Sequence, residues 1–226
     1  MNKEPSNDGK DYLGECFASQ RDSSGYKFAS ADLDRSYNYL LPALEKILSR
    51  HCKPVACRKI FEVGFGNGSL ANVLASWGYE ITGIDPSVEG VSHAMRSYPN
   101  LDLHVGSVYD NLPAQYGRFP IVISIEVVEH LYFPRKFASA LYELLEEGGT
   151  AIVSTPYHGY WKNLAMSVTG KLDGHFTALW DHGHIKFWSM KTLRYLLDEA
   201  GFRKIEFLRV GRIPVLAKSM IAIACK

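Results

Sequence analysis

The chain has 226 residues, of which 46% are hydrophobic and 22% are charged, and its formal net charge is +1 at pH 7. This length and composition indicate a soluble globular protein with one sizeable core. Because no basic excess is available to hold a polyanion, we expect no nucleic-acid partner.

The four cysteines show no CxxC spacing, which argues against a structural zinc site and a disulfide framework. The first ten residues are polar, and no run reaches the ~18 consecutive apolar residues of a membrane span. We therefore expect a cytoplasmic protein that is neither exported nor transmembrane. The cysteines are Cys16, Cys52, Cys57 and Cys225.

Two regions differ in pattern along the chain. Residues 1–30 mix small polar residues with isolated aromatic ones and predict a loose N-terminal arm. Residues 31–226 predict a single domain, which begins with a helix over 34–49 where apolar residues recur at helical spacing.

Strand-like and helix-like runs then alternate, which predicts an α/β fold with a doubly wound, mostly parallel sheet of the Rossmann type. Two closely spaced strands at the C-terminal end predict an antiparallel hairpin, giving seven strands in all. The predicted strands are 59–63, 79–84, 101–105, 121–125, 150–154, 204–210 and 219–225, and the predicted helices between them are 70–77, 88–98, 134–145 and 191–200.

Three glycines stand at alternate positions between the first strand and its helix: Gly64, Gly66 and Gly68. Glycine adopts positive φ and lets the backbone approach a ligand, and the helix start beyond offers free N–H groups. The GxGxG spacing differs from the GxGxxG of dinucleotide binders, so we expect a nucleoside without pyrophosphate. Asp85 ends the second strand, where an acidic residue holds ribose hydroxyls in such folds.

This loop and acid resemble the first two motifs of class I S-adenosylmethionine-dependent methyltransferases, and the resemblance spans about residues 59–210. It implies that the glycine loop contacts the methionine part of S-adenosylmethionine, that the acid holds the ribose and that residues after the third strand flank the adenine. The implied cofactor-binding residues are Glu62, Gly64, Phe65, Gly66, Gly68, Asp85, Pro86, Gly106, Ser107, Val108, Ile125 and Glu126.

The fourth strand runs into Glu126, Glu129 and His130, at the strand edge where open α/β sheets bind ligands. This Glu-x-x-Glu-His segment resembles ubiquinone-biosynthesis O-methyltransferases, and the resemblance implies that the three side chains hold a divalent cation such as Mg²⁺. A cation would lower the pKa of a bound phenol. The alternative is that the three side chains cap a helix and shape a metal-free pocket.

A long insert, residues 156–190, separates the fifth strand from the next helix and carries seven aromatic residues and four histidines. Its length and composition predict a lid over the acceptor pocket. The layout resembles the same O-methyltransferases and implies His182 or His184 as the general base, with His182 preferred; His130 is a further catalytic candidate. An amphipathic helix over 160–172 could also touch lipid transiently, but a pocket cover is favoured.

The sequence therefore predicts methyl transfer from S-adenosylmethionine to a small acceptor, with O-methylation of a phenol or similar hydroxyl as first choice. One alternative is a nicotinamide-dependent oxidoreductase, because Tyr132 and Lys136 have the spacing of a short-chain dehydrogenase pair, although Pro134 disfavours the helix that pair needs. The other is a noncatalytic cofactor-binding module. The acceptor and the oligomeric state are left open.

Overall fold

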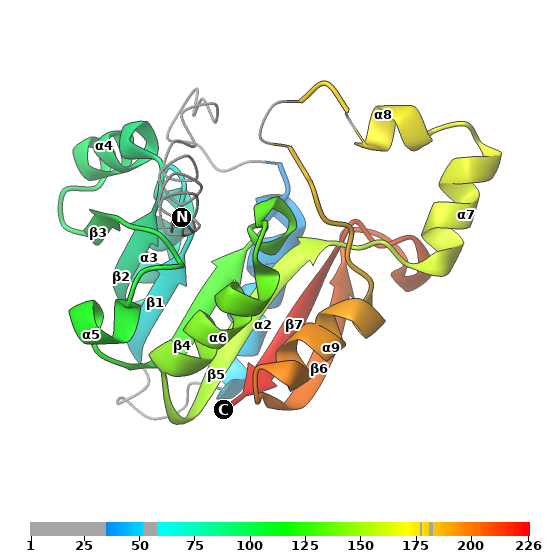
Figure 1. Cartoon of the computed structure of the whole chain (residues 1–226). Helices are drawn as coiled ribbons and strands as arrows, with labels where there is room; N and C mark the ends of the chain where they lie inside the picture. Colours follow the sequence, from blue (N-terminus) through cyan, green and yellow to red (C-terminus); the bar gives the residue numbers. More distant parts are fainter. Residues whose placement is uncertain (1–34, 52–57, 177, 181–182) are drawn as a thin grey trace, which may run out of the picture.

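The structure is a computed structural model that describes residues 35–51, 58–176, 178–180 and 183–226. The predicted N-terminal arm and His182 lie outside these residues. Seven strands form one sheet in the order β3-β2-β1-β4-β5-β7-β6 (Figure 1). The strands are β1 (Lys59–Val63), β2 (Glu80–Asp85), β3 (Asp102–Val105), β4 (Phe119–Ile125), β5 (Leu145–Pro156), β6 (Arg203–Val210) and β7 (Ser219–Cys225).

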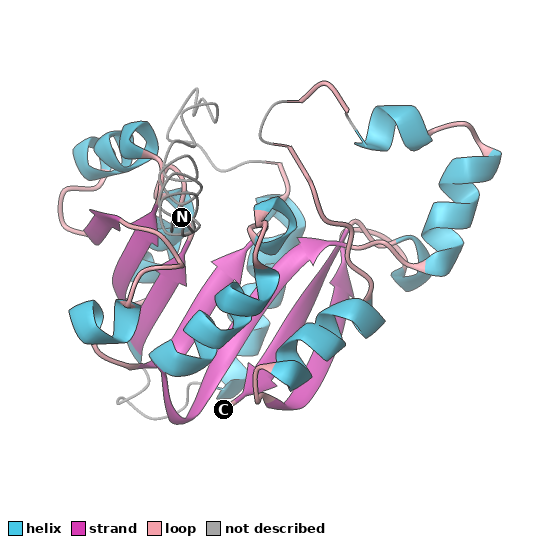
Figure 2. Cartoon of the chain, viewed as in Figure 1, coloured by secondary structure: helices cyan, strands magenta, loops and turns pink. Residues whose placement is uncertain are grey.

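The direction of the strands agrees with the prediction. Strands β1 to β5 pair in parallel, while β7 lies antiparallel between β5 and β6. This confirms the doubly wound parallel sheet with an antiparallel C-terminal hairpin. Because each parallel strand needs a crossover connection, helices follow the strands in the chain and cover both faces of the sheet (Figure 2).

The helices divide between two hydrophobic cores, one on each face of the sheet. Leu44, Leu70 and Val91 bring α2, α3 and α4 onto one face, and Leu112, Phe137 and Leu197 bring α5, α6 and α9 onto the other. The helices are α2 (Tyr37–His51), α3 (Ser69–Ser76), α4 (Val88–Ser97), α5 (Leu112–Tyr116), α6 (Pro134–Leu144) and α9 (Met190–Glu199).

The central strands contribute side chains alternately to both cores, which explains their nearly continuous apolar sequences. In β4, Val122 belongs to the core beneath α6, and Ile121 and Ile123 belong to the core beneath α2. Strands buried on both faces read as apolar runs rather than as alternating ones. This is why β1, β4 and β5 could be located in the sequence.

Three local expectations were incomplete. Strand β5 begins at Leu145, well before the predicted 150, because Leu145 pairs with Phe119 before a register shift at Ile121. The short helix α5 was not predicted, since five residues are too few for a helical pattern. Helix α2 runs over Tyr37–His51 rather than over the predicted 34–49, and Pro42 inside it does not end it.

The insert contains two short helices, α7 (Tyr160–Val168) and α8 (Leu172–Phe176), which lie to one side of the sheet beyond the end of β5 (Figure 1). Its two ends are held together by a bridge between Tyr157 and Trp188. Helix α7 has no buried residue. The insert is therefore anchored at its ends, while its helices project from the body of the domain.

Candidate functional site

One edge of the sheet collects the predicted site residues. Strands β1, β2, β3 and β4 are parallel neighbours, so their carboxyl ends lie along the same edge. The glycine loop follows β1, Asp85 ends β2, Gly106 follows β3 and Glu126 follows β4. Open α/β sheets bind their ligands at this edge, and the fold thus places the predicted residues in one region.

The glycine loop is held in shape by Asp85. The carboxylate accepts a hydrogen bond from the N–H of Gly66 at 2.9 Å and another from the N–H of Ser87 at 2.8 Å. Burial raises the pKa of Asp85, and these two hydrogen bonds oppose the rise. Each oxygen keeps a second lone pair, so the carboxylate can still accept hydrogen bonds from a ligand.

Two glycines of this loop are required by its geometry. Gly64 has φ +80°, and a Cβ there would lie 2.5 Å from Cγ2 of Val127. Gly68 has φ +76°, and a Cβ there would lie 2.9 Å from Cβ of Ala94. The loop after β1 therefore packs against the segment after β4 without room for side chains.

Glu62 lies at the base of the loop and is fully buried, and its Oε2 atom has no hydrogen-bond partner among the residues that the structure describes. Burial, and next the charge of Asp85, raise the pKa of Glu62 to about 8. The ligand-free protein therefore holds Glu62 mainly as the neutral acid at pH 7. An unpartnered carboxyl group beside a glycine loop is available to a donor on a bound ligand.

Other predicted cofactor residues have structural roles that limit how they can act. The ring of Phe65 is buried against Gly83 and Leu103, so any cofactor contact of Phe65 would come from its backbone. Gly106 donates its N–H to the carbonyl of Asp85 at 3.1 Å, and Val108 is buried in the core. The remaining candidates, Pro86, Ser107 and Ile125, lie in the segments after β2 and β3 and at the end of β4.

Glu126 has a strained backbone at the end of β4, with φ +56°. Its Oε1 accepts a hydrogen bond from Ser154 Oγ at 2.7 Å, and its Oε2 accepts one from Ser219 Oγ at 3.4 Å. Positive φ at a non-glycine residue is uncommon and often marks a functional position. The two serines were not singled out in the sequence, because only the sheet pairing brings them beside Glu126.

A second group of side chains gathers next to it. One possible ligand atom from each of Glu129, His130 and His184 lies within 4.8 Å of the others. The predicted set of Glu126, Glu129 and His130 differs from this group, which contains His184 and not Glu126. The carboxylate of Glu126 is hydrogen-bonded to Ser154 and Ser219. His184 is brought there by the insert, whose Ile185 N–H donates to the carbonyl of Glu129 at 2.9 Å.

Glu129 has the character of a cation ligand. Its side chain is fully buried beside Thr155, whose hydroxyl opposes the rise in its pKa, but neither carboxylate oxygen accepts a hydrogen bond of good geometry in the described structure. Burial, and next the charge of Glu126, raise the pKa of Glu129 well above its usual value. A buried carboxylate without a partner is costly unless it is protonated or binds a cation.

The two histidines of the group differ in their chemistry. His130 Nδ1 lies 3.1 Å from the carbonyl oxygen of Gly183, so Nδ1 carries the proton in the tautomer that donates this bond, and Nε2 is left as an acceptor. Burial, and next the charge of His130, lower the pKa of His184 to about 4. An imidazole of such low pKa is a weak general base but a good metal ligand.

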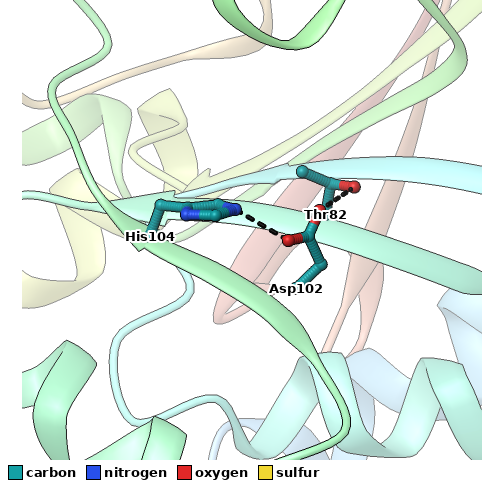
Figure 3. A network of polar contacts seen from close by, with 3 residues as sticks. All are labelled: Thr82, Asp102 and His104. Atoms are coloured by element: carbon teal, nitrogen blue, oxygen red, sulfur yellow. Dashed lines mark hydrogen bonds and ion pairs between the residues drawn. The ribbon is translucent and has the colours of Figure 1, made fainter.

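A network of similar appearance elsewhere has a different character. The Thr82 hydroxyl donates to Asp102 Oδ2 at 2.9 Å, and Nε2 of His104 lies 2.7 Å from Asp102 Oδ1 (Figure 3). The hydroxyl and the imidazole both bond to the carboxylate rather than to each other, so no nucleophile–base pair is formed. The network ties the edge strand β3 to β2.

The dehydrogenase-like pair does not form. Tyr132 is 63% exposed and precedes α6, which begins at Pro134, while Lys136 lies in the first turn of that helix with its ammonium over the ring of Phe133. A catalytic Tyr–Lys pair at this spacing needs both residues on one helix face. The structure therefore removes the observation that supported the oxidoreductase alternative.

Comparison with known proteins identifies the family. Residues 26–206 match a family described as a methyltransferase domain. The chain belongs to this methyltransferase family. A ubiquinone biosynthesis O-methyltransferase of Bradyrhizobium sp. is 27% identical over 172 residues, which cover 71% of this chain and 66% of that protein. S-Adenosylmethionine is the cofactor of the family.

Solved structures agree with this fold. A SAM-dependent methyltransferase from Archaeoglobus fulgidus matches with a TM-score of 0.60 and 15% identity, over 83% of this chain and 93% of that one. Human N-acetylserotonin methyltransferase in complex with SAM matches with a TM-score of 0.58 and 18% identity, over 83% of this chain and 55% of that one.

The alignments with curated relatives cover only part of the length of those relatives. The chain spans 46% to 70% of the length of curated relatives that it matches.

Among the described residues, no helix has both the length and the apolar character needed to cross a bilayer.

Proposed function

We propose that this methyltransferase domain transfers the methyl group of S-adenosylmethionine to a hydroxyl of a small acceptor, with a phenol as the favoured acceptor. The observation that carries the proposal is the shared sheet edge. Gly64 of the glycine loop packs directly against Val127, one residue from Glu126 and two from Glu129. A cofactor in the loop would therefore present its methyl group near the acidic and imidazole side chains.

The reaction places modest demands on the protein. Methyl transfer from a sulfonium is an in-line displacement, which requires alignment of nucleophile and methyl carbon and exclusion of water. In the proposed arrangement the loop amides and Asp85 orient the cofactor, and the side chains after β4 orient the acceptor. We also propose that the insert, residues 156–190, acts as the lid.

A hydroxyl acceptor must lose its proton, because a phenol of pKa ~10 is neutral at physiological pH. We propose that Glu129, His130 and His184 hold a divalent cation, which when bound would lower the pKa of a hydroxyl placed beside it. Two imidazoles and one carboxylate suit a transition metal such as Zn²⁺ better than Mg²⁺, which prefers oxygen ligands. His182 remains a proposed base for a metal-free reaction.

The decisive test combines cofactor binding with product analysis. Calorimetry with S-adenosylhomocysteine should give micromolar binding. Labelled S-adenosylmethionine should then transfer methyl to members of a panel of phenols, alcohols, amines and carboxylates, and the methylated atom should be oxygen of a hydroxyl. Absence of cofactor binding would leave a noncatalytic role, and methylation of nitrogen alone would overturn the hydroxyl assignment.

The cation is tested separately by elemental analysis. Chelator-stripped protein should take up about one equivalent of Zn²⁺ or Mn²⁺ per chain in preference to Mg²⁺, and Glu129→Gln and His184→Gln should each lower the metal affinity by about 10- to 100-fold. Glu206→Gln, which changes an exposed carboxyl on β6, should retain the metal affinity of the unmodified protein. Failure of the unmodified protein to bind any of these metals would remove the cation and leave the methyl-transfer proposal standing.

A further inference from the structure

Basic side chains gather on the part of the insert nearest the candidate site. Lys162 comes from α7, His175 from α8 and His158 from the segment after β5. The rings of His158 and His175 have centroids 5.1 Å apart, and burial, followed by the charge of Lys162, lowers the pKa of both. Three separate segments thus bring basic groups together.

Lys162 lies close to the proposed reaction centre. Its Nζ donates to the carbonyl oxygen of Lys218 at 3.3 Å, and the next residue, Ser219, donates its hydroxyl to Glu126. Burial, and next the charge of Arg212, lower the pKa of Lys162 to about 8, while the charge of Glu126 opposes this. The ammonium group is therefore partly desolvated and lies at the start of β7, next to the serine that donates to Glu126.

No acidic side chain neutralises this group of residues. The ion pairs among the described residues involve His104, Arg135 and Lys226, and none includes Lys162, His158, His175 or Arg212. The carboxylate of Glu126, whose charge acts on Lys162, is hydrogen-bonded to Ser154 and Ser219. The positive charge beside the site therefore comes from Lys162 and Arg212, while His158 is neutral at pH 7.

Aromatic rings lie beside both histidines, with the ring of Phe176 5.7 Å from that of His175 by centroids. The ring of Phe187 lies 5.0 Å from that of His158, and Phe176 lies 4.8 Å from Phe187 by ring centroids. Phe176 and Phe187 are partly exposed, at 37% and 44%. An aromatic acceptor could stack on these rings while a substituent reaches the lysine.

We propose that Lys162, together with His158 and His175, forms a subsite for an anionic substituent, a carboxylate or a phosphate, on an aromatic acceptor. The inference rests on the proposed function and narrows its substrate class. A partly desolvated ammonium gains from an anion because the ion pair restores the stabilisation that burial removes. Neutral His158 would add a hydrogen bond rather than a charge, and exposed Arg212 would attract the anion from solvent.

The test measures binding to protein already loaded with S-adenosylhomocysteine. Calorimetry should show 3,4-dihydroxybenzoate binding at least about tenfold more tightly than its neutral counterpart 3,4-dihydroxybenzamide, as one charge-assisted hydrogen bond predicts. Lys162→Gln should abolish most of that difference. Lys171→Gln, which removes an exposed lysine from the same insert, should preserve it.

Competition distinguishes the two anions. Benzoate and phenyl phosphate are each used to displace 3,4-dihydroxybenzoate, and the stronger competitor identifies carboxylate or phosphate as the substituent. Its advantage should disappear in Lys162→Gln. Equal affinity for the acid and the amide in wild-type protein, or an unchanged preference in Lys162→Gln, would overturn the subsite.

Failure of the subsite and failure of the proposed function give different results. If S-adenosylhomocysteine does not bind at all, the proposed function fails before the acceptor is tested. If S-adenosylhomocysteine binds equally to wild type, Lys162→Gln and Lys171→Gln, the cofactor site is intact in each variant. A lost charge preference can then be assigned to Lys162 alone.

Discussion

At the scale of single residues, Asp85 has two roles: it holds the backbone of the glycine loop, and it is the proposed acceptor for the ribose of the cofactor. Its two oxygens each accept one backbone N–H, from Gly66 and from Ser87, across a strand end and a loop. A glutamine or asparagine amide at such a position has one acceptor oxygen and an NH₂ group that only donates. The carboxylate is therefore the group that satisfies both amides.

We expect Asp85→Asn to weaken S-adenosylhomocysteine binding by about 10- to 100-fold, because one loop amide would face an NH₂ group and the ribose would lose a charged acceptor. Calorimetry measures the change. Asp102→Asn, which alters an exposed carboxylate on β3, is the matched control and should bind normally. Equal affinity of Asp85→Asn and wild type would show that Asp85 has no role in binding.

Glu62 makes stability depend on pH. Its pKa is about 8 in the folded protein and ~4.3 in an unfolded chain, so the fold favours the neutral acid. The contribution of neutral Glu62 to the free energy of unfolding is fully present below the unfolded pKa. It is lost as the pH rises through the folded pKa. Between pH 5 and pH 8.5 the loss is of the order of 4 kcal/mol.

Glu62→Gln should remove this loss because glutamine does not ionise. In urea unfolding of cofactor-free protein, the variant should gain stability relative to wild type as pH rises from 5 to 8.5. Glu206→Gln, an exposed position on β6, should run parallel to wild type. Parallel curves for Glu62→Gln and wild type would contradict the raised pKa.

At the scale of elements, the turn from β1 to α3 depends on close packing as well as on positive φ. Gly64 and Gly148 have φ +80° and +77°, but a Cβ at Gly148 would meet nothing within 4 Å among the described residues, whereas one at Gly64 would overlap Val127. Comparing the two positions separates backbone strain from steric overlap.

We expect Gly148→Ala to cost about 1 kcal/mol of unfolding free energy, from φ alone, and Gly64→Ala to cost about 3 kcal/mol. Adding Val127→Ala to Gly64→Ala should recover about half of the larger cost by removing the overlapping methyl groups. Chemical denaturation of the single and double variants measures these unfolding free energies. Equal costs at the two glycines would show that the overlap is absent in solution.

The helices of the insert and of the body should differ in what they contribute to stability. Leu164 on α7 is 41% exposed and Leu141 on α6 is fully buried. Leu141→Ala should cost about 2–5 kcal/mol through its cavity, and Leu164→Ala should change stability by about 0.5 kcal/mol or less. Thermal unfolding compares them, and a large cost for Leu164→Ala would mean that α7 packs on the body in solution.

The fold and the cofactor loop could be predicted because their signals are local. Buried parallel strands read as apolar runs, and Gly64, Gly66, Gly68 and Asp85 lie within 22 residues of one another. His184 could not be joined to Glu129 in this way, because 55 residues separate them and their proximity depends on the hydrogen bond from Ile185 N–H to the Glu129 carbonyl. The proximity of Glu129, His130 and His184 is a product of tertiary structure.

At the scale of the whole molecule, the proposed cofactor site lies across the carboxyl ends of four neighbouring strands and between the two faces of the sheet. The core on one face includes Phe65 of the loop, and the core on the other includes Val108 after β3. A ligand that contacts the loops after β1, β2 and β3 would therefore bind only when both cores are formed. Cofactor binding and unfolding of the entire domain should be linked.

We expect S-adenosylhomocysteine at 100 times its Kd to stabilise the domain by about 2.7 kcal/mol, which for a chain of this size raises Tm by about 6 °C. The melt should remain a single transition, since both cores share the sheet. NADH at the same concentration is the control for the nicotinamide alternative, and Asp85→Asn is the control for the site. A shift with NADH in place of S-adenosylhomocysteine would reverse the cofactor assignment, whereas a shift confined to one of two transitions would show that the two cores unfold independently.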